Sequence, residues 1–160
     1  MTIFFRFGFF TLATWLLMAC GGEPPMDKNE RLTQTIQAME TAVEAKGLDD
    51  FFSHVSDDFV SAERGWSKKD AERILRLRLM RQSSVHVVQV IKDIQWLDGG
   101  DQQATVEVVA AMAGTEFSLS EMPGFRGDMI QFMVTFKLID DEYKVIQTEW
   151  QRATPADFVF

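Results

Sequence analysis

The spacing of apolar residues changes once along this chain, and the change limits the fold to a helical part followed by a sheet. Before Ser83 the apolar residues recur every three or four positions, as on one face of a helix. After Ser84 they alternate with polar residues, as in a half-exposed antiparallel sheet. A chain of 160 residues has room for one domain. We therefore expect an α+β domain with helices packed on one face of the sheet.

The helical part is expected to contain three helices, over residues 28–46, 48–55 and 67–82. The third opens with the Ser-x-x-Asp pattern of a capping box. Residues 59–60, between the second and third, can form a brief strand or a turn. The first helix has apolar side chains on one face, at spacings of four, three and four: Leu32, Ile36, Met39 and Val43.

The alternating part predicts four strands, over residues 85–97, 102–113, 128–139 and 143–152. Taking both hairpin loops as three residues long fixes the register, because a slip of one residue turns every side chain to the other face. One face is then apolar: Val88, Val90, Ile94, Trp96, Ala104, Val106, Val108, Ala110, Ile130, Phe132, Val134, Phe136, Ile146 and Trp150. The other is mostly polar: Thr105, Glu107, Gln131, Thr135, Lys137, Gln147 and Glu149.

The first nineteen residues form an apolar stretch with one charge, Arg6, and end in small residues before Cys20, the single cysteine. The stretch is shorter than the ~20 residues of a spanning helix, which is typical of a signal peptide. Leu17-Met18-Ala19-Cys20 resembles the lipobox of bacterial lipoproteins. That resemblance implies a signal peptide over 1–19 and lipidation of Cys20 with fatty acyl chains, palmitate among them.

The lipoprotein resemblance also implies a location in the bacterial cell envelope. The lipid on Cys20 would hold the chain at a membrane, and residues 20–27 would form a short tether. Glycine at position 21 resembles lipoproteins sent to the outer membrane, where the domain would face the periplasm. An uncleaved anchor helix with a buried cysteine is the alternative.

Charge excludes one class of partner. Without residues 1–19, the chain keeps 15 basic and 24 acidic side chains, a net charge of −9. A domain this acidic is repelled by nucleic-acid phosphates and by anionic lipid, so we expect no nucleic-acid binding. Membrane attachment then needs a covalent lipid or apolar insertion.

Residues 28–152 are similar in element order to the nuclear-transport-factor-2-like fold, which includes ketosteroid-isomerase-like and SnoaL-like proteins. The segments that carry the resemblance are DDFFSHVSDDF, at 49–59, and the closing strand YKVIQTEWQ, at 143–151. The resemblance implies helices over a curved antiparallel sheet that leave a cone-like, mostly apolar pocket. Such domains host isomerases, dehydratases and non-enzymatic binders, so the fold alone assigns no activity.

The expected pocket combines the apolar sheet face with the first helix. Lys92 is its exceptional member. Either a β-bulge returns its ammonium to solvent, or it lies in the cone and favours a carboxylate ligand. The proposed ligand-binding residues are Leu32, Ile36, Val90, Lys92, Ile94, Val108, Phe132, Val134, Ile146 and Trp150.

We expect no catalytic residue, cofactor or metal. In the predicted register Tyr143 lies on the polar face, away from the pocket, and His54 and His86 lack carboxylate partners at metal-ligand spacing. Asp57 or Asp58 leaning into the cone would change this view. The preferred function is a non-catalytic domain that binds a small apolar or amphipathic molecule or a protein partner. The alternatives are an isomerase, hydratase or hydrolase in the same pocket, and a structural module that homodimerises through the sheet face.

Three segments keep two interpretations each. Residues 115–127 extend the strands or form a lid or partner-binding loop. Residues 157–160 pack on the domain or stay exposed. The basic residues of the third helix form a solvated face, or they dock an acidic partner or envelope phosphates: Lys68, Lys69, Arg73, Arg76, Arg78 and Arg81.

Overall fold

The structure is a computed structural model that describes residues 26–125 and 127–159. The expected signal peptide and Cys20 lie outside these residues. The α-helices are α1 (Lys28–Glu44), α2 (Leu48–Ser53) and α3 (Lys68–Leu79). The strands are β1 (Val55–Ser61), β2 (His86–Trp96), β3 (Gln103–Ala113), β4 (Asp128–Ile139) and β5 (Glu142–Arg152). Three short 3-10 helices are η1 (Leu97–Gly99), η2 (Leu119–Gly124) and η3 (Pro155–Phe158).

The expected α+β class is confirmed, and local signals explain where the two long helices begin. The Asp27 side chain accepts a hydrogen bond from the Asn29 backbone N–H at the start of α1. At the start of α3, Ser67 and Asp70 form the reciprocal capping box that their spacing predicted. Both starts satisfy backbone N–H groups that have no partner inside a helix.

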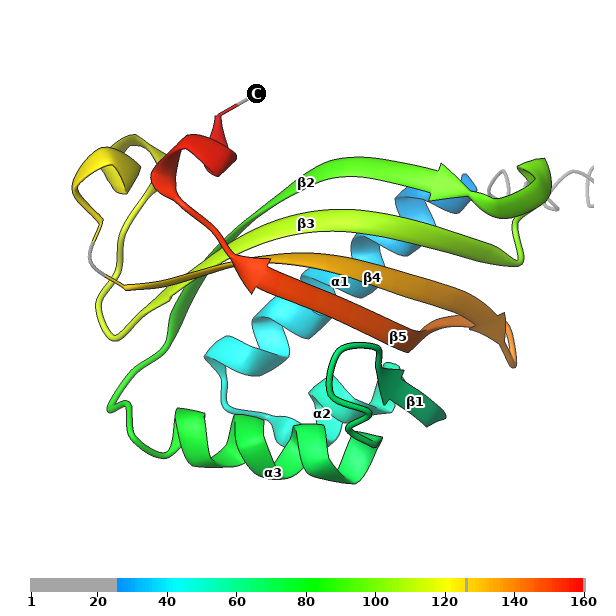
Figure 1. Cartoon of the computed structure of the whole chain (residues 1–160), viewed down its shortest axis with the longest axis horizontal. Coiled ribbons are helices and arrows are strands. Elements are labelled where there is room, and N and C mark those ends of the chain that lie inside the picture. Colours follow the sequence, from blue (N-terminus) through cyan, green and yellow to red (C-terminus); the bar gives the residue numbers. More distant parts are fainter. Residues whose placement is uncertain (1–25, 126, 160) are drawn as a thin grey trace, which may run out of the picture.

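The five strands form one curved sheet in the order β1-β5-β4-β3-β2. Strands β2 to β5 are antiparallel neighbours, whereas β1 pairs in parallel with β5. In Figure 1 the α-helices lie on the concave side of the sheet, with α1 crossing it and α3 along the molecule's edge. We call the face under the helices the inner face. Strand β1 is longer than the brief strand or turn expected at 59–60.

A β-bulge divides β2. The side chains before the bulge lie on the opposite face of the sheet from the one that unbroken alternation predicts. Ile91 pairs with Val108 and Asp93 with Glu107, so Lys92 is the extra residue. The bulge anticipated as one reading of Lys92 is therefore present. Residues after it, such as Ile94, lie on the inner face as expected. The expected inner position of Val88 and Val90 is wrong, because they precede the bulge and lie on the opposite, outer face beside Ala111 and Val109.

The second hairpin corrects the position of Tyr143. The turn has two residues instead of three, because Ile139 pairs with Glu142. Asp140 and Asp141 both have positive φ, 51° and 66°, as a type I′ turn requires. The shorter turn places Tyr143 on the inner face, where it is 1% exposed. A bulge at Ile146 then restores the expected pairing, so Phe132 lies opposite Trp150.

Each face of the sheet carries its own apolar core. The inner core is the larger one, and Leu32 and Ile36 of α1, expected in the pocket lining, are buried in it. Its buried members are Leu32, Ile36, Phe52, Val55, Phe59, Ala104, Val106, Val108, Phe136, Tyr143 and Val145. The outer core lies under η2 and η3, since Met122 of η2 and Phe158 of the tail are both buried in it. Its buried members are Val90, Val109, Ala111, Met122, Ala153 and Phe158.

Candidate functional site: the inner face of β1, β5 and β4

Strand pairing aligns inner-face side chains in rows across the sheet. One row contains Ser61, Thr148 and Val134, from β1, β5 and β4. The next contains Trp150 and Phe132. We call these five residues the concave strip. Both rows continue onto β3, at Val106 and Val108, and onto β2, at Ile94 and Ile91.

Burial separates the strip from the rest of the inner face. On β3, Val106 is fully buried and Val108 is 6% exposed, because the helices cover them. Their neighbours Val134, Phe132 and Trp150 are only half-buried. The concave strip thus combines apolar side chains with access from solvent, as a small-molecule site requires.

Ser61 gives the strip an unsatisfied polar atom. Its side chain is 3% exposed, and within the described residues its Oγ is the buried side-chain atom without a hydrogen-bond partner. A buried hydroxyl in this state costs about 1–3 kcal/mol unless a partner reaches it. The sequence pattern predicted a helix that ends at residue 55 and a brief strand or turn at 59–60, and Ser61 was missed. The available signal was a small polar residue two positions after Phe59, which strand alternation turns to the same face as Phe59.

Two arginines lie at the open side of the strip. The Arg64 guanidinium lies over Trp150, 5.5 Å from the ring centroid, and 4.9 Å from that of Trp66. Arg152 occupies the next inner-face position of β5, opposite Ile130, and is exposed. A planar cation stacked on an indole is a good partner for a carboxylate. Sequence reasoning assigned this role to Lys92 and missed Arg64, which lies in the loop before α3.

The remaining predicted pocket residues divide between the two faces. Ile94, Val108, Phe132, Val134 and Trp150 lie on the inner face. Ile146 is the extra residue at the bulge of β5, between Val145 and Gln147. Val90 belongs to the outer core, and Lys92 donates a 2.7 Å hydrogen bond from its ammonium to the Val159 carbonyl oxygen. The expected pocket position of Val90 was wrong, because it assumed unbroken alternation along β2. For Lys92, of the two alternatives, the structure has the bulge, which turns the ammonium away from the inner face.

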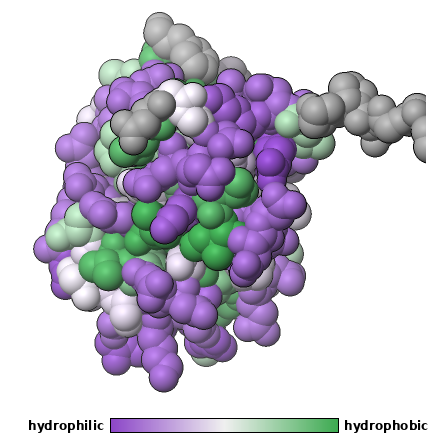
Figure 2. All heavy atoms as spheres, turned by 90° about the vertical axis from the view of Figure 1, so that its right-hand side faces the viewer, coloured by the Kyte–Doolittle hydropathy of each residue, from purple (hydrophilic) through white to green (hydrophobic). Residues whose placement is uncertain are grey.

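Away from the concave strip, a hollow of about 560 Å³ opens between α1, the end of α2 and the β4–β5 turn. The space-filling view toward this end of the molecule has apolar side chains in the middle of the face, surrounded by polar ones (Figure 2). Its lining residues are Met26, Arg31, Gln34, Thr35, Ala38, His54, Asp141, Glu142 and Tyr143.

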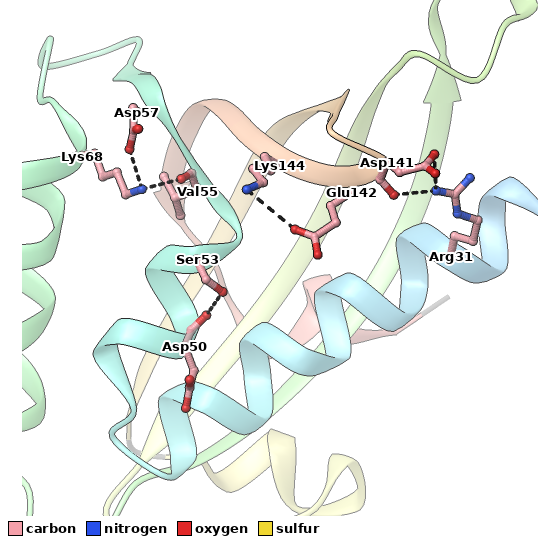
Figure 3. Close-up of polar contacts among 9 residues, drawn as sticks. All are labelled: Arg31, Asp50, Ser53, Val55, Asp57, Lys68, Asp141, Glu142 and Lys144. Carbon is pink, nitrogen blue, oxygen red and sulfur yellow. Dashed lines mark hydrogen bonds and ion pairs between the residues drawn. The ribbon is translucent and has the colours of Figure 1, made fainter.

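The main polar groups of this hollow bind one another. Arg31 donates a 2.8 Å hydrogen bond to the Asp141 carbonyl oxygen and lies over the Tyr143 ring, 5.4 Å from its centroid. The Tyr143 hydroxyl donates to the Asp101 carbonyl oxygen, 2.8 Å away. Figure 3 shows Arg31 reaching from α1 to the turn at Asp141. These contacts fix the turn against α1, so the concave strip, with its unpaired hydroxyl, is the better candidate site.

Of the acidic residues considered for the cone, Asp57 and Asp58 are exposed on β1. The Asp57 carboxylate accepts a 2.9 Å hydrogen bond from the Lys68 ammonium, which lowers the pKa of Asp57 (Figure 3). Glu40 of α1 is different. It is partly buried against β2, and this desolvation raises its pKa despite a 2.7 Å hydrogen bond from the Gln89 amide. Gln89 is an inner-face residue, opposite Ala110.

The described part of the chain holds no cluster of three or more His, Cys, Asp and Glu side chains that could bind a metal. No helix in residues 26–125 or 127–159 is long and apolar enough to cross a membrane.

Comparison of the whole structure with solved structures identifies the fold. A candidate scytalone dehydratase from Novosphingobium aromaticivorans superposes with a TM-score of 0.62 and 11% sequence identity, over 79% of this chain and 85% of its own. An NTF-2 like protein of unknown function from Shewanella oneidensis gives 0.60 and 14%, over 78% and 98%. The fold is nuclear-transport-factor-2-like (NTF2-like).

The NTF2-like neighbours are diverse, which limits what they imply. A candidate dehydratase of the NTF2-like family from Streptomyces avermitilis superposes with a TM-score of 0.55 and 13% identity, over 78% of this chain and 94% of its own. No family model and no curated protein sequence matches the chain. At these identities the likeness extends to the NTF2-like fold and not to any activity.

Proposed function

We propose that this chain is a lipid-anchored envelope lipoprotein whose NTF2-like domain binds a small amphipathic molecule without converting it. The concave strip is the proposed binding site. The ligand has an apolar body, which lies against Phe132, Val134 and Trp150, and an anionic end, such as a carboxylate, beside Arg64. The Ser61 hydroxyl donates a hydrogen bond to a polar atom of the ligand or accepts one from it.

The observation that carries this proposal is the unpaired, buried Ser61 hydroxyl beside half-buried apolar side chains. A polar ligand atom at Ser61 offsets the desolvation cost of the hydroxyl. Each Å² of apolar ligand surface removed from water contributes about 25 cal/mol. Arg64 supplies the positive charge from an exposed position, and its stacking on Trp150 holds the guanidinium beside the apolar side chains.

The test compares matched ligands. Fatty-acid-like carboxylates should bind the purified protein more tightly than alcohols of equal chain length in isothermal titration calorimetry. Arg64→Gln should remove the difference between the two ligand classes. Phe132→Ser should weaken both, and Lys137→Gln, on the outer face, should change neither. Equal affinity of both classes for the unmodified protein would refute the anionic preference, and failure of both to bind would refute the site.

A hydratase or isomerase is the second candidate function, and the raised pKa of Glu40 favours it. A carboxyl group with a raised pKa on the inner side of the sheet is a suitable general acid or base. If the protein turns over a substrate, and Glu40→Gln abolishes turnover but keeps ligand affinity, the proposed function changes from binding to catalysis. Turnover that Glu40→Gln leaves intact would exclude this role for Glu40.

The anchoring half of the proposal rests on the Leu17-Met18-Ala19-Cys20 motif and on the single cysteine. Several acyl chains on Cys20 would give stable attachment, whereas one chain binds a membrane only reversibly. Cys20→Ser should leave an unprocessed precursor in its bacterial host. A mature protein whose N-terminus is an unmodified residue other than Cys20 would contradict lipidation.

The homodimer through the outer sheet face is a further proposal of the same kind. Segments η2 and η3 cover one part of that face, so the dimer would use the uncovered part, where Met133 is 38% exposed. Native mass spectrometry of the purified protein distinguishes a monomer from a dimer and detects any co-purified ligand. Met133→Lys should dissociate the dimer, and a dimer that survives this change would exclude the outer face as its interface.

A further inference from the structure

The exposed side of α3 combines cations with large apolar side chains. Its residues fall on one helical stripe, at spacings of four, three, one and three: Lys69, Arg73, Arg76, Leu77 and Met80. We call this stripe the α3 surface. Leu77 is 54% exposed and Met80 is 75% exposed, which is costly in water for side chains of this size. The opposite side of α3 faces the domain, where Leu79 is buried and Leu75 packs against the inner core.

We propose that the α3 surface docks on the anionic headgroups of a phospholipid membrane. A helix that lies in a membrane interface places apolar side chains between the acyl chains and cations at the phosphate level. Leu77 and Met80 fill the first role, and Lys69, Arg73 and Arg76 fill the second. In Figure 1, α3 runs along the edge of the molecule, so its exposed side can lie flat against a surface.

The net charge of −9 without residues 1–19 repels anionic lipid from the domain as a whole, but this contact depends on the charges close to the membrane surface. At physiological ionic strength the Debye length is about 8 Å, so an anionic surface responds to nearby charges and only weakly to the rest of the domain. The side chain of Arg73 is 74% exposed and that of Arg76 is 51% exposed. Their ion pairs with Asp70 and Glu72 are solvent-screened, so lipid phosphates can replace those partners.

The apolar pair decides between a membrane and an acidic protein. An acidic protein surface would neutralise the cations but would leave Leu77 and Met80 without a hydrophobic environment. A membrane interface satisfies both groups with one partner. Contact through α3 is independent of the concave strip and of lipid on Cys20, since it needs only a nearby anionic surface.

The test uses the full chain with Cys20→Ser and Met80→Cys, labelled with an environment-sensitive fluorophore and reconstituted into vesicles. Phosphatidylcholine vesicles are compared with vesicles that also contain phosphatidylglycerol, both doped with headgroup spin-labelled lipid. The label at position 80 should be quenched several-fold more strongly on the anionic vesicles, and high salt should reduce the quenching. A label placed by Met133→Cys on the outer sheet face should be quenched equally on both.

Charge variants separate docking from general attraction. Arg73→Gln with Arg76→Gln should abolish the lipid-dependent quenching at position 80, whereas Lys137→Gln with Lys144→Gln, which removes the same charge from the outer sheet face, should preserve it. Circular dichroism melts check that each variant is folded. Equal quenching at position 80 on neutral and anionic vesicles, or loss of quenching in both double variants, would overturn the proposal. Ligand affinity at the concave strip should not change in any of them, so the two proposals fail separately.

Discussion

The Lys92 ammonium donates a 2.7 Å hydrogen bond to the carbonyl oxygen of Val159, which joins the bulge of β2 to the C-terminal tail. The bulge turns the Lys92 side chain outward, and the tail residue Phe158, 5% exposed, packs into the outer core beside Val90. Lys92, which one alternative placed in the pocket, therefore holds a segment on the opposite face.

The first prediction concerns this tail. Phe158→Ala should lower the free energy of unfolding by about 3 kcal/mol, because it leaves a cavity in the outer core. Lys92→Met should lower it by about 1 kcal/mol through loss of one partly exposed hydrogen bond. Urea denaturation followed by tryptophan fluorescence measures both. A cost for Phe158→Ala below that of Lys92→Met would contradict the tail's packing.

The second prediction tests the reversal of β2 at its bulge. Val90→Thr should lower the free energy of unfolding by about 1–3 kcal/mol, since it places a hydroxyl without a partner in the outer core. Val60→Thr is the matched control. Val60 is 47% exposed on β1, so the same substitution there should change stability by less than about 0.5 kcal/mol. If the two variants have the same melting temperature, Val90 is not buried.

A third prediction concerns the hydroxyl of Tyr143. Tyr143→Phe removes its hydrogen bond to the Asp101 carbonyl oxygen and should cost about 1 kcal/mol. Tyr143→Ala also removes a buried ring from the inner core and should cost about 3–5 kcal/mol. Chemical denaturation distinguishes the two. If Tyr143 lay on a solvated face, as the sequence suggested, both variants would unfold near the wild-type midpoint.

The fourth prediction follows from the raised pKa of Glu40. A carboxyl whose pKa is higher in the folded state favours folding when it is protonated and opposes folding when it is ionised. Glu40→Gln removes the ionised form and should therefore raise the melting temperature at pH 7. The gain should disappear as the pH falls below the ordinary Glu value of about 4.3. Melting curves recorded between pH 4 and pH 7 measure this difference. A Glu40→Gln variant that melts below the wild type at pH 7 would contradict the prediction.

Chain-local features predicted much of the architecture. Helix starts at Asp27 and Ser67 depend on contacts within three residues, and apolar spacing placed Leu32 and Ile36 in the inner core. The pairing of Phe132 with Trp150 was also predicted correctly. These features need only the periods of helix and strand, which any short stretch of sequence displays.

The residues of the candidate site could not be predicted where the alternation of inner and outer side chains is interrupted, because only tertiary structure shows these interruptions. The bulge at Lys92 moved Val90 to the outer face, and the two-residue turn at Asp140–Asp141 moved Tyr143 to the inner one. An extra residue in one strand is visible only against its partner strand, because the partner's register defines which residue is unpaired. Ser61 and Arg64 joined the site because β1 pairs with β5 across more than eighty residues of sequence. The sequence by itself determined the periods and the caps, whereas the contacts between distant strands decided which side chains share a face.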